Sequence, residues 1–392
     1  MTQPAAPTAR QLAPFAALSA TYFGHIGFFN PYLALWLKSL GLPLVTISVL
    51  ASCQAVTRVF APYAWGALSD HTGERVRLLR VAAVMALAAS LGLWWPGGAW
   101  WVGCVLLLVF TATSSMMSLT EAAMAHFVAG NWGRYGRIRL WGSAGFLVTV
   151  FVAGAWFERF GMGHFPGWTL VTLLLVLGCT WWMPDAHDRP APGSAADRPP
   201  VWPVLRQPAV AWFFASVFFH VMAHYAVYAY FSLFLDAHGY SKVTIGVLWA
   251  ISVLVEILWF FSQGRLQHRR RMTQWLVVCG MATVLRMALT GGAPGLLPVL
   301  ALAQVLHALT FATHHTACIA LVTQHFPGRL RARGQALFTV TGYGLGGVAG
   351  VVAGGAVASR ASFEWMFFSA AGVALLGSAC AWHANKVAPG AS

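Results

Sequence analysis

The chain has 392 residues, of which 58% are hydrophobic and only 9% charged, and its mean hydropathy is +0.67. Soluble domains carry about 25% charged residues, so this composition excludes an ordinary soluble protein. A net charge of +14 would favour nucleic acid as the partner of a soluble chain. In a membrane protein the same charge can instead report topology, which its placement along the chain decides.

Apolar stretches of about 20 residues, the length needed to cross a bilayer, recur along the whole chain. We therefore expect an all-α membrane protein with twelve spans, near 14–37, 44–68, 78–95, 100–128, 138–158, 167–183, 208–235, 243–266, 272–291, 296–325, 335–358 and 363–385. The first stretch is too long for a signal-peptide core and lacks a small-residue cleavage site, so we expect it to remain in the mature protein.

The basic residues favour one side of the membrane. With both termini in the cytoplasm, most Lys and Arg residues fall on cytoplasmic segments, as the positive-inside rule expects. The exceptions are Lys38, Arg159, Lys242 and Arg360 on the other side, and Arg58 and Arg286 within spans. Lys is scarce, with 3 residues against 21 Arg, which is typical of a GC-rich bacterial genome. The sequence thus predicts a multi-pass protein of the bacterial inner membrane, with no nucleic-acid partner.

A proline-rich polar break divides the chain into two halves. We expect an N-terminal six-helix bundle over 1–183, a cytoplasmic linker over 184–207 and a C-terminal bundle over 208–392. Shifting the chain by 198 residues aligns the stretch from Tyr32 with that from Tyr230, with 11 of 37 positions identical. Two repeats of six spans with a site near the midplane are typical of secondary transporters.

The stretch GALSDHTGER at the end of the second span carries the first family signature. Gly66 would permit close helix contact, Asp70 would satisfy a helix N-terminus and Gly73 would make the turn before Arg75. The motif resembles the cytoplasmic loop signature of the major facilitator superfamily. That resemblance implies the major facilitator fold, two pseudo-symmetric bundles that alternate access, and a gating role for Gly66, Asp70, Gly73 and Arg75.

Two further stretches narrow the resemblance. YGRIRLWGSAGF from Tyr135 and GYSKVTIGVLWAISVLVE from Gly239 are similar to parts of the 3-phenylpropionate permease group. That group is itself similar to nucleoside/proton symporters and, more distantly, to lactose permease. The resemblance implies proton-driven import of a small solute, with an aromatic acid as one candidate substrate, by a monomer in the lipid bilayer.

Four charged residues lie more than two positions from either end of a span: Arg58, Glu121, Glu256 and Arg286. A charge near the bilayer centre costs about 2.5–3.5 kcal/mol on the mildest scale, so it usually has a function. Glu256 lies well inside its span, whereas Glu121 is close enough to the end of its helix to reach the interface. We expect Glu256, and secondarily Glu121, to carry the proton.

Glu256 in the eighth span, Arg286 in the ninth and His307 in the tenth resemble the coupling set of lactose permease. One position departs from that pattern, because Thr310 stands where lactose permease has an acid, so Glu256 takes the proton-carrying role by elimination. A carboxylate can load and release a proton when its surroundings alternate between apolar burial and a nearby Arg. The alternative is a purely structural ion pair between Glu256 and an Arg.

Substrate is expected to bind between the halves, on Arg139 of the fifth span and on Glu256, Arg286 and His307. Polar and aromatic faces of neighbouring spans add His220, His224, Trp249, Tyr22 and His25 as candidate ligands. For each aromatic face, ordinary helix packing is the alternative, and for Arg139 the alternative is a positive-inside anchor. His220 and His224 have metal-ligand spacing but no carboxylate or Cys beside them at helical spacing, so we expect neither a metal nor a cofactor.

Other functions stay open at this stage. A nucleoside or sugar/proton symporter and a proton-driven drug or metabolite exporter share the same architecture, and a membrane ligand sensor would bind without flux. A membrane-embedded enzyme would need a nucleophile or metal constellation, and the sequence has neither. No glycine-rich loop ends in Lys-Ser or Lys-Thr, so no ATP-binding loop of the usual kind is present.

Overall fold

The computed structural model describes residues 9–95, 97–128, 132–184, 200–263 and 270–388, and within these ranges the chain forms helices and no strands. Twelve helices are long and apolar enough to cross a membrane. They run over Leu12–Ser39, Leu44–Thr72, Arg75–Trp94, Gly98–Glu121, Ile138–Phe160, Met162–Trp182, Pro208–Ala237, Lys242–Ser262, Met272–Gly292, Leu297–His325, Arg331–Arg360 and Phe363–Val387. The prediction of an all-α protein with twelve spans is therefore confirmed.

Most spans are built around one long α-helix. These helices are α1 (Ala9–Ser39), α2 (Leu44–Thr72), α3 (Arg75–Ser90), α6 (Trp132–Phe160), α7 (Phe165–Trp182), α9 (Pro208–Ala237), α10 (Lys242–Ser262), α12 (Met272–Gly292) and α17 (Phe363–Val387). A short helix, α8 (Trp202–Leu205), precedes α9. Most of the predicted linker over 184–207 lies outside the described residues.

Three spans are interrupted, which the apolar pattern did not predict. The fourth consists of α4 (Gly98–Thr113) and α5 (Met116–Val128). The tenth joins α13 (Leu297–Val305) to α14 (His314–His325) through a π-helix over Ala308–Thr313. The eleventh joins α15 (Arg331–Phe338) to α16 (Gly347–Arg360) through a π-helix over Thr339–Gly346. Such π-segments change which backbone carbonyls are bonded within the helix, and they are frequent at functional sites.

Packing divides the chain into two compact units. Unit 1 comprises Met1–Trp36 and Phe60–Ala191, and unit 2 comprises Leu37–Val59 and Pro192–Ser392. The segment Leu37–Val59 belongs to the N-terminal half by sequence but packs with unit 2. The predicted bundles at 1–183 and 208–392 remain predictions, because compactness in one conformation does not define a domain.

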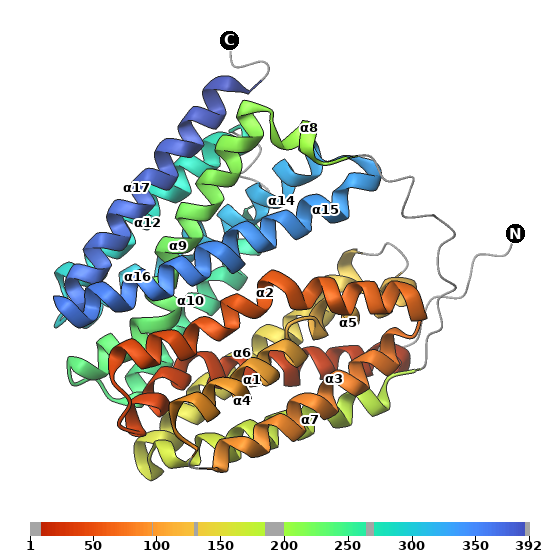
Figure 1. Ribbon diagram of the computed structural model, residues 1–392, viewed down its shortest axis with the longest axis vertical. Coiled ribbons are helices and arrows are strands. Elements are labelled where there is room, and N and C mark those ends of the chain that lie inside the picture. The colour runs from red at the N-terminus through yellow and green to blue at the C-terminus, as the bar shows by residue number, and fades with distance from the viewer. Residues whose placement is uncertain (1–8, 96, 129–131, 185–199, 264–269, 389–392) are drawn as a thin grey trace, which may run out of the picture. The chain divides into compact units, whose positions relative to one another are not determined.

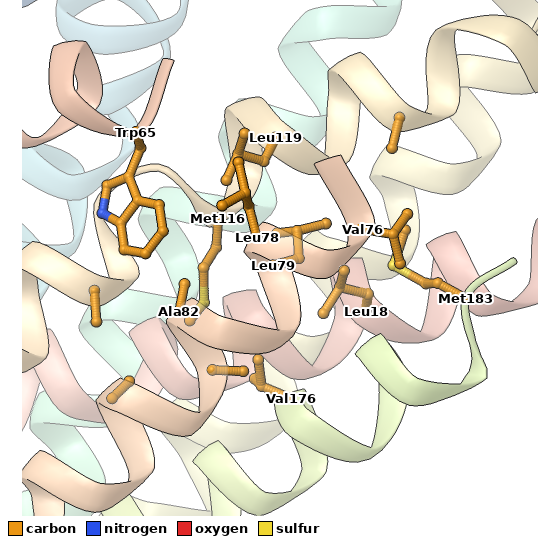
Figure 2. Packing of buried hydrophobic residues seen from close by; sticks show 14 of the residues in the cluster. Leu18, Trp65, Val76, Leu78, Leu79, Ala82, Met116, Leu119, Val176 and Met183 are labelled. Carbon is orange, nitrogen blue, oxygen red and sulfur yellow. The ribbon is translucent and has the colours of Figure 1, made fainter. Parts of the chain in front are cut away.

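The core of unit 1 is a cluster of buried apolar side chains, seen in Figure 2. Leu18 of α1, Trp65 of α2, Leu79 of α3 and Val176 of α7 all contribute to it. The indole nitrogen of Trp65 donates to the backbone oxygen of Thr111 at 2.9 Å, so the one polar atom of this large side chain is satisfied. Met116 of the fourth span and Ile138 of the fifth also belong to it, so the cluster packs six spans around a common interior.

Glycines bring α1 and α6 of unit 1 into backbone contact. A Cβ on Gly145 would collide with the backbone oxygen of Ala20, and one on Gly27 would lie 2.7 Å from the backbone oxygen of Phe146. Small residues permit this close approach between membrane helices. Tyr32 of α1 donates its hydroxyl to the backbone oxygen of Val150 at 3.0 Å, which ties the same two helices together.

Unit 2 repeats this arrangement between α9 and the eleventh span. A Cβ on Gly350 would collide with the backbone oxygen of Met222, and Tyr230 donates its hydroxyl to the backbone oxygen of Val351. Tyr32 and Tyr230 are equivalent under the 198-residue shift, so the repeat seen in the sequence reappears as the same helix contact in each unit. Helix α17 packs against both α9 and α12, and Figure 1 shows these three helices side by side.

The segment Leu37–Val59 is held in unit 2 by three polar contacts, which we call the α2 tether. The ammonium of Lys38 lies 2.7 Å from the carboxylate of Asp236, a residue 198 positions further on. The hydroxyl groups of Tyr230 and Ser48 are hydrogen-bonded to each other at 2.7 Å. The guanidinium of Arg58 lies over the ring of Tyr343, 5.4 Å from its centroid. The tether therefore includes one of the four charged residues inside the spans.

Candidate functional site in unit 2

The centre of the site is the guanidinium of Arg286 on α12. Arg286 is 1% exposed and is among the largest fully buried side chains of the described residues. One terminal nitrogen, Nη1, donates to His307 Nδ1 and to Thr310 Oγ1, each at 3.0 Å. The other, Nη2, donates to Gln304 Oε1 at 2.9 Å. All three acceptors belong to the tenth span, so one stretch of chain holds the buried cation.

His307 connects Arg286 to Glu256. Its Nε2 lies 3.5 Å from Glu256 Oε2, and the two side chains are 8% and 21% exposed. An Arg side chain only donates hydrogen bonds, so the Nδ1 atom that faces Arg286 must accept. His307 is therefore neutral in this geometry, with its proton on Nε2 directed at Glu256. Glu256 is partly exposed while Arg286 is buried, and the chain Glu256–His307–Arg286 runs between them.

No carboxylate lies within 4.0 Å of the Arg286 guanidinium among the described residues, and Glu256 is paired with His307. Glu256 and Arg286 therefore make no direct ion pair in this conformation, and the proton-carrying role of Glu256 stays a prediction. The reason is geometric, since the imidazole ring occupies the space between the two charges.

Three further histidines stack beside this chain. The rings of His220 and His314 are parallel within 5° with centroids 3.5 Å apart, and those of His220 and His224 are 4.6 Å apart. His220 Nε2 donates to the backbone oxygen of Thr310 at 2.8 Å, and His224 Nδ1 donates to the backbone oxygen of His220 at 3.1 Å. Thr310 lies in the π-helix, where its carbonyl accepts from His220 and its hydroxyl accepts from Arg286.

These histidines are close together but are not arranged as a metal site. The described residues contain no group of three His, Cys, Asp or Glu side chains that could hold a metal ion. Imidazole nitrogens bind a metal through lone pairs in the ring plane, and parallel stacked rings direct those lone pairs alongside one another. His220 bonds to the tenth span, whereas the hydrogen bond of His224 stays within α9 and its Nε2 is buried without a partner among the described residues.

Arg139 and Glu121 lie in unit 1 and form a looser pair. Arg139 Nη1 lies 3.7 Å from Glu121 Oε1, and both side chains are 39% exposed. The Arg139 guanidinium also lies over the ring of Phe23 at 4.9 Å. Gly142, one turn further along α6, permits this approach, because a Cβ there would lie 2.6 Å from the Phe23 ring.

Three other candidate ligands are engaged within their own units. His25 Nδ1 bonds to Thr172 Oγ1 at 2.9 Å, and the Tyr22 hydroxyl donates to the backbone oxygen of Thr113 at 3.3 Å. The indole nitrogen of Trp249 donates to Ser232 Oγ at 3.0 Å. Each of these contacts joins two helices of one unit. Their predicted role as substrate ligands stays a prediction.

The loop motif after the second span takes the expected turn but not the expected contacts. Gly73 has φ of +68° and its amide donates to the Ser69 carbonyl at 2.9 Å, which ends the helix. A Cβ on Gly66 would meet no described atom within 4 Å. Asp70 is exposed, and the cap before Arg75 is Glu74 with no side-chain cap bond. In this conformation the predicted Gly66 contact and Asp70 cap are therefore absent among the described residues, and the gating role remains a prediction.

Sequence reasoning missed Gln304 and undervalued Thr310. Gln304 is fully buried and is one of the three acceptors of Arg286. Its signal was an amide in an otherwise apolar segment, LPVLALAQV, one turn before His307. Thr310 was noted only as the position where an expected acid is missing, whereas its hydroxyl holds the guanidinium.

Comparison with curated proteins places this chain among transporters. It is 27% identical over 343 residues to the probable 3-phenylpropionic acid transporter of Escherichia coli (strain K12), covering 83% of this chain and 85% of that protein. It is 24% identical over 327 residues to the maltose permease of Geobacillus stearothermophilus, covering 82% of each.

Solved structures show the same fold at lower identity. The nucleoside transporter NupG matches with a TM-score of 0.79 and 17% identity, covering 97% of this chain and 100% of that one. The D-xylose-proton symporter matches with a TM-score of 0.72 and 14% identity, covering 97% and 98%. At these identities the likeness shows the fold alone, which is the major facilitator fold that the sequence predicts.

The family model described as "MFS_1 like family" matches residues 16–369, which is nearly the whole chain. The relatives and structural neighbours are all transporters, which confirms the prediction of a transporter and not an enzyme. The chain is a multi-pass membrane protein and a secondary transporter, and it belongs to the MFS_1 like family of the major facilitator superfamily.

Proposed function

We propose that the chain is a proton-coupled symporter that imports a small aromatic carboxylate, such as 3-phenylpropionate, across the bacterial inner membrane. The observation that carries this proposal is the Arg286 guanidinium, a buried cation that has only neutral acceptors among the described residues. A buried charge without a counter-ion costs several kcal/mol. A substrate carboxylate would supply that counter-ion, and guanidinium groups bind carboxylates well because they present several donors in one plane.

Glu256 is the group that can take up the proton without disturbing Arg286. If His307 bound a second proton at Nδ1, it would lose the 3.0 Å hydrogen bond from Arg286 and place two donors face to face. Glu256 contacts the far nitrogen of the ring and is 21% exposed, so it is less enclosed than Arg286. Protonating Glu256 leaves the bond between Arg286 and His307 intact.

Charge balance then couples the proton to the substrate. In the empty form, the Arg286 cation and the Glu256 carboxylate cancel across His307. In the loaded form, the substrate carboxylate is the counter-ion of Arg286 and Glu256 is protonated, so the sum is again zero. A form with only the substrate or only the proton gains one net charge inside the membrane, which is unfavourable. Reorientation is thus restricted to two forms, which couples one proton to each carboxylate.

Stacked rings beside Arg286 support an aromatic substrate. His307 and Phe311 lie parallel within 3° at 5.1 Å, and Phe311 and His315 lie within 18° at 5.9 Å. This face of the tenth span offers flat ring surfaces next to a cation, which suits a phenyl group attached to a carboxylate. The similarity to the probable 3-phenylpropionic acid transporter of Escherichia coli agrees with this chemistry.

The proposal includes orientation and partners. An even number of spans puts both termini on one side, and the distribution of Lys and Arg favours the cytoplasm as that side. The working unit is a monomer in the lipid bilayer, with the substrate and protons as its partners. Reporter fusions at each terminus that are active only in the cytoplasm test the orientation directly.

The test of function is the external pH of a lightly buffered suspension of de-energised cells that express the protein. The panel contains 3-phenylpropionate, cinnamate, nucleosides and disaccharides. We expect alkalinisation with the aromatic carboxylates only, and no alkalinisation in cells that carry Glu256→Gln.

Three other results would overturn parts of the proposal. Alkalinisation by nucleosides or disaccharides would replace the carboxylate with a neutral solute. A carboxylate response that survives Glu256→Gln would remove Glu256 from coupling. Silence across the panel, with the protein shown to be in the membrane, would favour an exporter or a ligand sensor.

A further inference from the structure

Three neutral groups hold Arg286, and two of them have no assigned role. Gln304 and Thr310 are 0% and 1% exposed, and both accept hydrogen bonds from the guanidinium. An Arg nitrogen can only donate, so the atom of Gln304 that faces Arg286 must be the amide oxygen and not the amide nitrogen. With His307, these residues fix the direction of the guanidinium through its two terminal nitrogens.

Thr310 is itself pinned from a second side. Its hydroxyl accepts from Arg286, while its backbone oxygen accepts from His220 Nε2 at 2.8 Å. Thr310 lies in the π-helix over Ala308–Thr313, a kind of segment that is frequent at functional sites. The acceptor set of Arg286 is therefore rigid and preorganised.

The acceptors position the guanidinium without neutralising it. Buried Arg residues are ordinarily paired with carboxylates, which satisfy the hydrogen bonds and the charge together. Here neutral groups accept hydrogen bonds from both terminal nitrogens, and no carboxylate contacts the guanidinium among the described residues. Two donors also remain buried without a partner among the described residues, Arg286 Nε and Gln304 Nε2. A cation and two available donors in two bonded residues form a surface for an anion.

We propose that the neutrality of positions 304 and 310 is what makes this transporter select an anionic substrate. Gln304 and Thr310 are specificity-determining residues, because a carboxylate at either position would neutralise Arg286 permanently and remove its attraction for substrate. This inference rests on the proposed function. It adds that selection for the anion lies in two uncharged side chains that hold the cation in place.

The experiment compares Gln304→Glu with Gln304→Met in the full-length protein purified in detergent, with radiolabelled 3-phenylpropionate as the probe. Gln304→Glu keeps the shape of the side chain and adds the negative charge. We expect its Kd for 3-phenylpropionate to rise at least about tenfold, as for loss of a buried charge partner, while its melting temperature stays at or above that of the wild type. Gln304→Met keeps the site cationic, so we expect a smaller rise in Kd and a lower melting temperature.

The pH dependence of the Kd distinguishes this role from a purely structural one, which would not change with pH. Lowering the pH protonates the carboxyl introduced by Gln304→Glu. The protonated carboxyl no longer neutralises Arg286, so the guanidinium can again attract the substrate carboxylate. We therefore expect the loss of affinity relative to the wild type to shrink as the pH falls. Thr310→Asp should show the same loss and the same recovery, whereas Thr310→Ser, which keeps the hydroxyl and adds no charge, should lose less affinity than Thr310→Asp and show no recovery in acid.

The outcomes separate this inference from the proposed function. If folded Gln304→Glu and Thr310→Asp bind 3-phenylpropionate as the wild type does, the inference fails although carboxylate transport stands. If Gln304→Glu does not fold, Thr310→Asp decides by the same criteria. If the wild type binds no aromatic carboxylate but binds a nucleoside or a disaccharide, the proposed function fails, and the inference that rests on it fails too.

Discussion

Each unit contains an acid and an arginine inside its spans, yet the two pairs differ in kind. In unit 1, Arg139 and Glu121 are 3.7 Å apart and both are 39% exposed. In unit 2, Arg286 is 1% exposed and reaches Glu256 only through His307. Arg139 and Glu121 face each other directly, whereas Arg286 is buried and His307 lies between it and Glu256.

The difference indicates which pair can couple ion movement to substrate. The Arg139–Glu121 pair is looser, with its nearest atoms 3.7 Å apart, so we expect loading or emptying it to change less. A buried cation with neutral acceptors depends strongly on the charge of whatever approaches it. Under the proposed mechanism, burial more than residue type therefore distinguishes the Arg286 site from the Arg139–Glu121 pair.

The largest expected effect is that of Arg286→Lys. An ammonium group cannot donate in one plane to His307, Thr310 and Gln304 together. Losing a partner in a buried charge cluster costs about 2–5 kcal/mol, so we expect uptake kcat/KM to fall about 30-fold or more. Initial rates in proteoliposomes with an imposed proton gradient measure this. A fall of less than about threefold would show that Arg286 behaves like the exposed pair.

The next effect separates the two acids. Glu256→Gln keeps the side-chain shape but cannot exchange a proton, so we expect gradient-driven accumulation to be lost while exchange of internal for external substrate continues. The matched control is Glu121→Gln, which we expect to stay within about twofold of the wild type because its pair is screened. Reversed results for the two variants would move proton coupling to unit 1.

A smaller effect is expected at the α2 tether, between Lys38 and Asp236. Exposed ion pairs are worth about 0.2–1 kcal/mol, so Lys38→Asp should change the uptake rate about twofold to fivefold by weakening the hold on Leu37–Val59. The double variant with Asp236→Lys restores opposite charges and should recover the rate. Failure of the double variant to recover would show that the contact observed at 2.7 Å does not control transport.

The smallest expected effect is that of Arg139→Lys. Its ion pair is partly exposed and its contact with the Phe23 ring is worth about 0.5–1 kcal/mol, much of which a Lys retains. We expect uptake within about threefold of the wild type, measured alongside Arg286→Lys. A tenfold or larger rise in KM would instead support the sequence-based prediction that Arg139 binds substrate.

Much of the site could be predicted because charges inside apolar spans are rare. Glu256, Arg286 and His307 were singled out from the sequence, and the structure connects them through contacts of 3.0 and 3.5 Å. Gln304 was missed because an amide in a span has no strong signal of its own, and its importance depends on which guanidinium reaches it. The sequence also singled out His25, Tyr22 and Trp249 as candidate ligands. In this conformation their polar atoms bond within their own units.

The sequence by itself determined the class of protein, the twelve spans and the family, because hydrophobic length and local motifs are properties of contiguous residues. It also revealed the repeat, which reappears as Tyr32 and Tyr230 bonding to equivalent helices. Only the tertiary structure decided that Leu37–Val59 packs with unit 2, that the tenth and eleventh spans contain π-helices, and that His307 stands between Glu256 and Arg286. These features depend on how side chains from distant spans fill a shared interior, and no local pattern encodes that packing.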